Sequence, residues 1–125
     1  MKNTKGLTLV ELLISAYILL IGICGILLLY VNIMSLTESS WDRTVATSHI
    51  ESILEEMQNK KTLNNIILTD WNEWAQNQNL KTLPQESFKV IYTDTSSDPL
   101  EIQVINQWQR KSGYNSINIR TKLTK

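Results

Sequence analysis

The stretch LLISAYILLIGICGILLLYV, residues 12–31, decides the fold of this protein. It belongs to a run of 26 residues between Glu11 and Glu38 that carry no formal charge. As a helix, such a run reaches ~39 Å at 1.5 Å per residue, and the hydrocarbon core of a bilayer is about 30 Å thick. The sequence therefore predicts a helix that spans a membrane.

The apolar segment differs from a removable secretory signal peptide. A signal peptide has an apolar region of about 7–15 residues followed by a small-residue cleavage site. The run here is longer and Asn32–Leu36 offers no such site, so we expect the segment to be retained. Lys2 and Lys5 precede the span, whereas the flank Glu38–Asp42 has no basic residue. This asymmetry favours a cytoplasmic N-terminus and an extracytoplasmic C-terminal domain.

The composition of the 125 residues excludes several classes of function. Twelve Lys and Arg balance twelve Asp and Glu, so the chain lacks the basic field of a nucleic-acid-binding protein and no nucleic-acid partner is expected. The single cysteine, Cys24, excludes an intrachain disulfide. The single histidine, His49, is expected on the surface of a helix or half-buried, because no metal-ligand or triad spacing surrounds it. We expect no enzyme, no catalytic residue, no cofactor and no metal.

The residues before the span carry a motif with a specific meaning. Glu11 is costly inside a membrane helix, by about 2.5–3.5 kcal/mol at the bilayer centre, so it either reaches the cytoplasmic interface or needs a cationic partner. In context, KGLTLVELLI at 5–14 resembles the processing motif of type IV prepilins and type II secretion pseudopilins. The resemblance implies that prepilin peptidase cuts after Gly6 and methylates the new α-amine of Leu7, where the family most often has Phe. It also implies that Glu11, at the fifth mature position, pairs with the amine of a neighbouring subunit.

Two glycines within the span, Gly22 and Gly25, are separated by three positions and would let another helix approach closely, although glycine is also simply frequent in membrane helices. The run IGICGI at 21–26 resembles minor pilins of the type IV pilus modification class (PilV-like) and the related type II secretion pseudopilin I. The resemblance implies a structural subunit of type IV pilus assembly or initiation, with a secretion pseudopilin as the alternative. Its partners would be other pilins or pseudopilins through the N-terminal helix, prepilin peptidase and the inner membrane. A stand-alone single-span protein with an external binding domain is a third interpretation.

The polar remainder predicts one small domain that shares the long helix. We expect a single helix over 7–59, whose second half carries an apolar stripe with helical spacing, formed by Ala46, Ile50, Ile53, Leu54 and Met57. A short helix is expected over Asp70–Asn77. Apolar and polar residues alternate within 88–92, 100–108 and 117–123, which predicts an antiparallel sheet with one apolar face.

The expected fold is therefore α+β and pilin-like. It has a leader peptide at 1–6, a transmembrane or filament-core helix at 7–34, and an extracytoplasmic globular domain at 35–125 that includes the second half of the helix. Such a chain is a single-pass protein of the inner (cytoplasmic) membrane or, once assembled, part of a pilus. The paired aromatics Trp71 and Trp74 could grip a partner, but in so small a domain such a pair more often belongs to the core or a lid.

Overall fold

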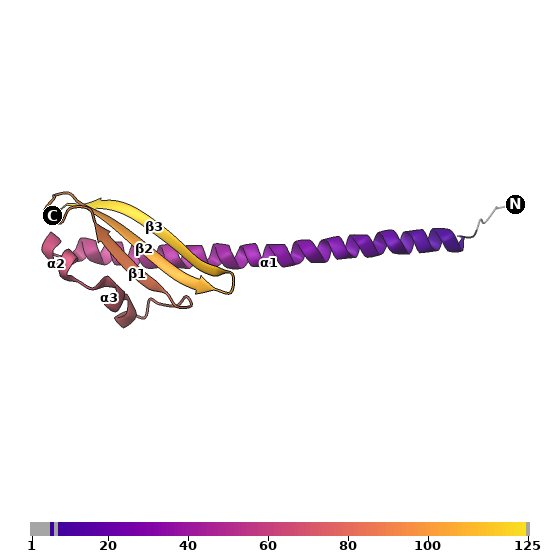
Figure 1. Cartoon of the computed structure of the whole chain (residues 1–125), viewed down its shortest axis with the longest axis horizontal. Helices are drawn as coiled ribbons and strands as arrows, with labels where there is room; N and C mark the ends of the chain where they lie inside the picture. The colour runs from indigo at the N-terminus through magenta and orange to yellow at the C-terminus, as the bar shows by residue number, and fades with distance from the viewer. Residues whose placement is uncertain (1–5, 7, 125) are drawn as a thin grey trace. The chain divides into compact units, whose positions relative to one another are not determined.

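The computed structural model describes residue 6 and residues 8–124, and it confirms the expected α+β fold (Figure 1). One long helix is followed by two short helices and three strands. The chain divides into two compact units, Met1–Ser39 and Ser40–Lys125, and the long helix contributes to both. In chain order the elements are α1 Leu9–Asn59, α2 Leu63–Leu68, α3 Trp71–Asn77, β1 Ser87–Tyr92, β2 Leu100–Arg110 and β3 Gly113–Leu123.

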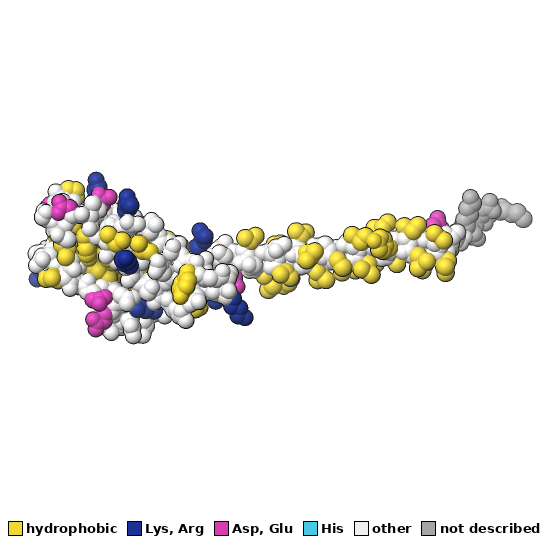
Figure 2. Space-filling view, in the orientation of Figure 1, with side chains coloured by type: hydrophobic (Ala, Val, Ile, Leu, Met, Phe, Trp, Pro, Cys, Tyr) yellow, Lys and Arg dark blue, Asp and Glu magenta, His cyan; other side chains and the backbone are white. Residues whose placement is uncertain are grey.

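The first unit consists of the apolar part of α1. Every side chain from Leu9 to Ser39 is exposed, and Figure 2 shows apolar side chains along this part of the helix. By length and composition, α1 is able to cross a membrane. An exposed apolar surface of this extent marks an interaction with a membrane or another protein.

The second half of α1 is polar on one side and buried on the other. Several of its hydroxyl groups donate to backbone carbonyls one turn earlier in the helix: Thr37 donates to the Ile33 carbonyl at 2.8 Å and Thr47 to the Arg43 carbonyl at 2.8 Å. The predicted stripe is confirmed for four of its members, while Leu54 is only partly buried. The buried residues of α1 are Asp42, Ala46, His49, Ile50, Ile53 and Met57.

The three strands form an antiparallel sheet in the order β1-β2-β3. Phe88 of β1 pairs with Asn106 of β2, which in turn pairs with Ile117 of β3. The β2–β3 hairpin closes at the pair Arg110–Gly113, and Gly113 has a φ of +124°, which a residue without a Cβ adopts readily. The side chains of β2 that face the core are Leu100, Ile102, Val104, Asn106 and Trp108.

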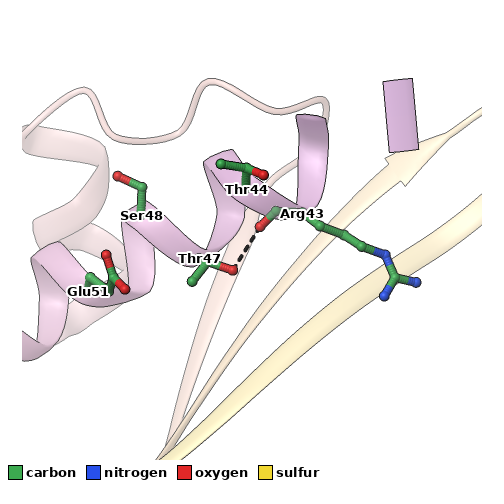
Figure 3. Close-up of a pocket in the computed structure, with 5 residues that line it drawn as sticks. All are labelled: Arg43, Thr44, Thr47, Ser48 and Glu51. Atoms are coloured by element: carbon green, nitrogen blue, oxygen red, sulfur yellow. Dashed lines mark hydrogen bonds between the residues drawn. The ribbon is translucent and has the colours of Figure 1, made fainter. Parts of the chain in front are cut away.

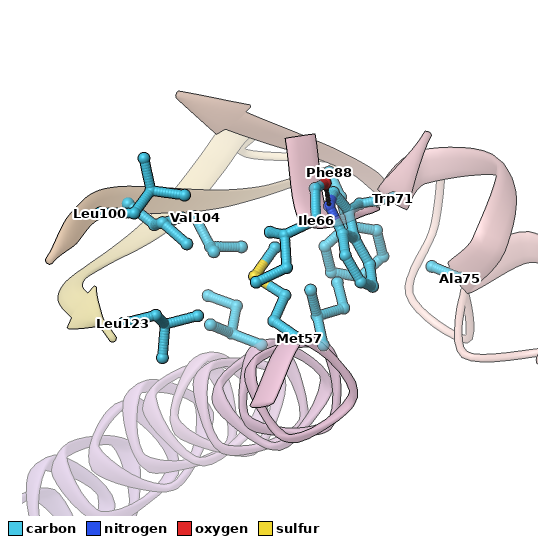
Figure 4. Close-up of a cluster of buried hydrophobic side chains, with 11 residues drawn as sticks. Met57, Ile66, Trp71, Ala75, Phe88, Leu100, Val104 and Leu123 are labelled. Atoms are coloured by element: carbon cyan, nitrogen blue, oxygen red, sulfur yellow. Dashed lines mark hydrogen bonds between the residues drawn. The ribbon is translucent and has the colours of Figure 1, made fainter. Parts of the chain in front are cut away.

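The core of the second unit lies between α1 and the sheet. Figure 4 shows Met57, Val104 and Ile66 directed toward one another from three different elements. The side chains that form this cluster are Ile50, Ile53, Met57, Ile66, Trp71, Ala75, Phe88, Leu100, Ile102, Val104 and Leu123. Burial of these apolar surfaces is the main term that holds the sheet on the helix.

The short helices close one side of this core. The predicted helix over Asp70–Asn77 is confirmed as α3, with the Asp70 carboxylate as its N-cap. The helix α2 was not predicted, and Thr62 caps it. Trp71 is 3% exposed and its Nε1 donates to the carbonyl of Ile66 at 3.0 Å, so this tryptophan belongs to the core.

Candidate functional site

The start of α1 is fixed by a reciprocal pair of side-chain contacts between Thr8 and Glu11. The backbone N–H of Thr8 donates to Oε2 of Glu11 at 3.0 Å, and the backbone N–H of Glu11 donates to Oγ1 of Thr8 at 3.2 Å. This is the capping box of the form T-x-x-E. The helix therefore begins at Leu9, two residues later than the sequence predicted. The Glu11 carboxylate also lies near the positive end of the helix dipole.

The predicted cleavage site lies just before this box. Gly6 is exposed, and a Cβ built there would meet no atom within 4 Å. Leu7, the predicted new N-terminus and methylation site, lies outside the described residues. Cleavage and methylation therefore stay predictions that rest on the motif.

The two glycines of the span lie on a helix surface that nothing covers. Gly22 and Gly25 are exposed, and a Cβ at either position would be in open space. Cys24, which lies between them in sequence, has an exposed free thiol. The surface around these residues is open to a neighbouring helix, which could approach the backbone more closely here than elsewhere along the span.

A buried polar cluster, formed by His49, Glu86 and Asn106, joins α1 to the sheet. Nδ1 of His49 lies 2.7 Å from Oε1 of Glu86, and Nδ2 of Asn106 donates to the same oxygen at 2.7 Å. The second oxygen of Glu86 accepts from the backbone N–H of Leu83 at 3.0 Å. The Glu86 side chain is completely buried. His49 is thus more deeply buried than the sequence indicated, at 8% exposure.

The cluster contains the groups of a catalytic triad in the right order, but its distances fit a structural role. Oγ1 of Thr82 lies 3.5 Å from Nε2 of His49, which completes the order hydroxyl, imidazole, carboxylate. That distance is at the limit of a hydrogen bond, beyond the 2.6–3.2 Å expected of a nucleophile and its base. The imidazole is also largely covered. The arrangement is suited to holding three elements together.

A second polar contact joins α1, near the point where it enters the second unit, to the last residue of β2. Nε and Nη2 of Arg110 donate to the two carboxylate oxygens of Asp42, each at 2.7 Å. The Asp42 side chain is 3% exposed. The guanidinium of Arg110 lowers the pKa of Asp42 by hydrogen bonding and by its charge, and this outweighs the opposing effect of burial.

Two hollows on the surface of the second unit are wide open to solvent. One, of about 370 Å³, follows the outward side of α1, and Figure 3 shows Arg43 extending away from the other side chains that line it. Its lining residues are Arg43, Thr44, Thr47, Ser48 and Glu51. Another, of about 410 Å³, lies beside α3 and includes Lys81, Gln85 and Glu86. Within residues 6 and 8–124, no group of three or more His, Cys, Asp or Glu side chains could hold a metal ion.

These features define an α+β protein with an exposed apolar N-terminal helix and a small C-terminal unit, called the head, that comprises residues 40–125. In the head, buried polar contacts hold the second half of α1 to the rest of the unit. No family model, curated protein or solved structure matches the chain.

Proposed function

We propose that the protein is a minor pilin, a structural subunit of type IV pilus assembly or initiation that prepilin peptidase processes. One combination of features carries this proposal: Gly6 lies directly before a long apolar helix, and Glu11 lies in its first turn. A plain membrane anchor requires neither residue. The apolar half of α1 would lie in the inner membrane before assembly and in the filament core afterwards.

The architecture of the head supports the same proposal. α1 continues from the apolar segment into the domain, where it contributes the buried residues on which the sheet packs. A helix shared in this way gives a subunit an apolar half to pack against other helices and a polar head to display. The pseudopilin of a type II secretion system is the alternative, because the same features serve that assembly.

The carboxylate of Glu11 has two roles to reconcile. It caps α1 through Thr8, and in the proposed assembly it also meets the α-amine of a neighbouring subunit. Unit charges ~4 Å apart attract by about 4 kcal/mol at an effective dielectric of 20. Desolvation of both groups offsets most of that attraction, so the main effect of the pair would be to set the register between subunits.

Leader cleavage is the first test of the proposal. The full chain is co-expressed with a prepilin peptidase, and the intact mass of the membrane-extracted product is measured. We expect a mass that corresponds to loss of residues 1–6 and to addition of one methyl group on Leu7. The variant Gly6→Val should block cleavage, because Gly6 is the last residue of the proposed leader, whereas Gly22→Val should be cleaved normally. The two variants are matched because neither position has a neighbouring atom that a side chain would displace. A wild-type product that keeps residues 1–6 would overturn the proposal.

A further inference from the structure

Two large aromatic side chains are exposed in the second unit although most of its aromatics are buried or half-buried. Trp41 is 67% exposed on α1, and Tyr114 is 80% exposed at the start of β3. The other large apolar side chains that are exposed in this unit, Leu68 and Ile91, lie on α2 and β1. Trp41 and Tyr114 are therefore candidates for contact with a partner surface.

The Asp42–Arg110 contact brings these two aromatics to the same end of the unit. Trp41 directly precedes Asp42 on α1, and Arg110 is the register partner of Gly113, the residue before Tyr114. The β2–β3 turn is thereby held beside the part of α1 where the chain enters this unit. Because the strands are antiparallel, the β1–β2 connection at 93–99 lies at the opposite end of the sheet.

The same end carries exposed cations. Arg43 on α1 and Lys111 in the β2–β3 turn are exposed, as is one acid on the preceding turn of α1, Glu38. The charge of Asp42 is matched by Arg110. The chain enters the unit at Ser40, shortly after the apolar segment ends. This end is therefore covalently tethered close to the membrane surface if the apolar segment spans the membrane.

We infer that this end of the head, defined by Trp41, Arg43, Lys111 and Tyr114 and called the tether face, rests on anionic phospholipid headgroups. Trp and Tyr side chains favour the layer between hydrocarbon and water, and Lys and Arg are attracted to anionic lipid phosphates. The inference rests only on the membrane-spanning part of the proposed function, and cleavage and assembly do not enter it. It gives the Asp42–Arg110 contact a function, which is to hold the hairpin against the membrane.

Headgroup quenching tests the tether face in the full chain. In a Cys24→Ser background, a single cysteine is introduced at Ser112 in the β2–β3 turn or, as the matched control, at the exposed Thr95 in the β1–β2 connection. Each variant is labelled with a fluorophore and reconstituted in phosphatidylcholine vesicles, with or without phosphatidylglycerol, that contain a lipid bearing a nitroxide on its headgroup. We expect clear quenching at position 112 and little at position 95, with more quenching at 112 when phosphatidylglycerol is present.

The roles of the aromatics and cations are tested by further substitutions. Trp41→Ser combined with Tyr114→Ser should reduce the quenching at position 112 toward that at 95, and Lys111→Glu should remove its dependence on phosphatidylglycerol. Equal quenching at both positions, or quenching at 112 that both sets of substitutions leave unchanged, would overturn the inference. Flotation of the same vesicles separates the two claims: a protein that floats without quenching keeps its anchor and refutes the tether face, and one that does not float refutes the span as well.

Discussion

Loss of the buried Glu86 carboxylate should strongly destabilise the second unit. This carboxylate accepts from Asn106 and from the backbone of Leu83, and it contacts His49. Glu86→Ala leaves the buried donors of Asn106 and Leu83 without an acceptor, and because each such loss costs about 1–3 kcal/mol, we expect a total cost of about 3–5 kcal/mol. Glu86→Gln keeps the shape but presents an NH₂ group to a site built from donors, so we expect it to cost about 1–3 kcal/mol.

The cost is measurable because two buried tryptophans report on the core. Trp71 and Trp108 are 3% and 2% exposed, so their fluorescence follows unfolding of the full chain by urea in mild detergent. With a denaturant slope of about 1–3 kcal/mol per M, a loss of 3–5 kcal/mol moves the midpoint by about 2 M. The matched control Glu55→Gln, at an exposed position of α1, should stay within about 0.5 kcal/mol of the wild type.

A double-mutant cycle identifies the partner of Glu86. Glu86→Gln and His49→Gln, alone and together, should show a coupling energy of about 0.5–3 kcal/mol, as residues of one hydrogen-bond network do. A Glu86→Ala midpoint equal to that of the wild type would refute the reasoning. Strict additivity in the cycle would refute the His49 contact specifically.

Three further outcomes are expected. Arg110 lowers the pKa of Asp42 below its usual 3.8. The contact therefore stabilises the fold above that pH and loses its effect as the pH falls through the lowered pKa. Asp42→Asn should lower the urea midpoint at neutral pH and flatten the decline in stability below about pH 4. Arg110→Ala should cost about 1.5–3 kcal/mol at neutral pH, since it leaves the buried Asp42 carboxylate without its charged donor; a midpoint equal to that of the wild type would contradict this. Ile53→Ala, in the fully buried core, should cost about 2–5 kcal/mol by the same assay, and a loss below 1 kcal/mol would mean that the sheet does not pack on α1 as described.

The parts of the fold that sequence patterns predicted are those with local causes. The apolar span, the stripe from Ala46 to Met57 and the alternation within the strands each follow from the spacing of neighbouring residues, and the structure has them. The polar contacts could not be found in this way, because Asp42 and Arg110 are 68 positions apart and His49 and Glu86 are 37 apart. Nothing local marks such pairs.

Two signals were nevertheless present in the sequence. Asn106 occupies a core-facing position in the alternation of β2, between buried Val104 and Trp108, and a polar residue at such a position requires a buried partner. The T-x-x-E spacing of Thr8 and Glu11, within the residues of the processing motif, is also a local capping signal. It explains why α1 begins at Leu9.

Incorporation into filaments tests the proposed function most directly, and the capping box provides a matched pair of variants. Glu11→Gln removes the charge but keeps a side chain that can cap, whereas Thr8→Ala weakens the cap by about 1 kcal/mol and keeps the charge. The measurement is the amount of this protein in sheared filaments relative to the membrane fraction. We predict that wild type and Thr8→Ala enter filaments, while Glu11→Gln remains in the membrane with its leader removed. Two results would contradict the account. One is that Glu11→Gln enters filaments as well as the wild type does. The other is that the wild type is absent from filaments and that deleting the protein leaves the number of filaments per cell unchanged.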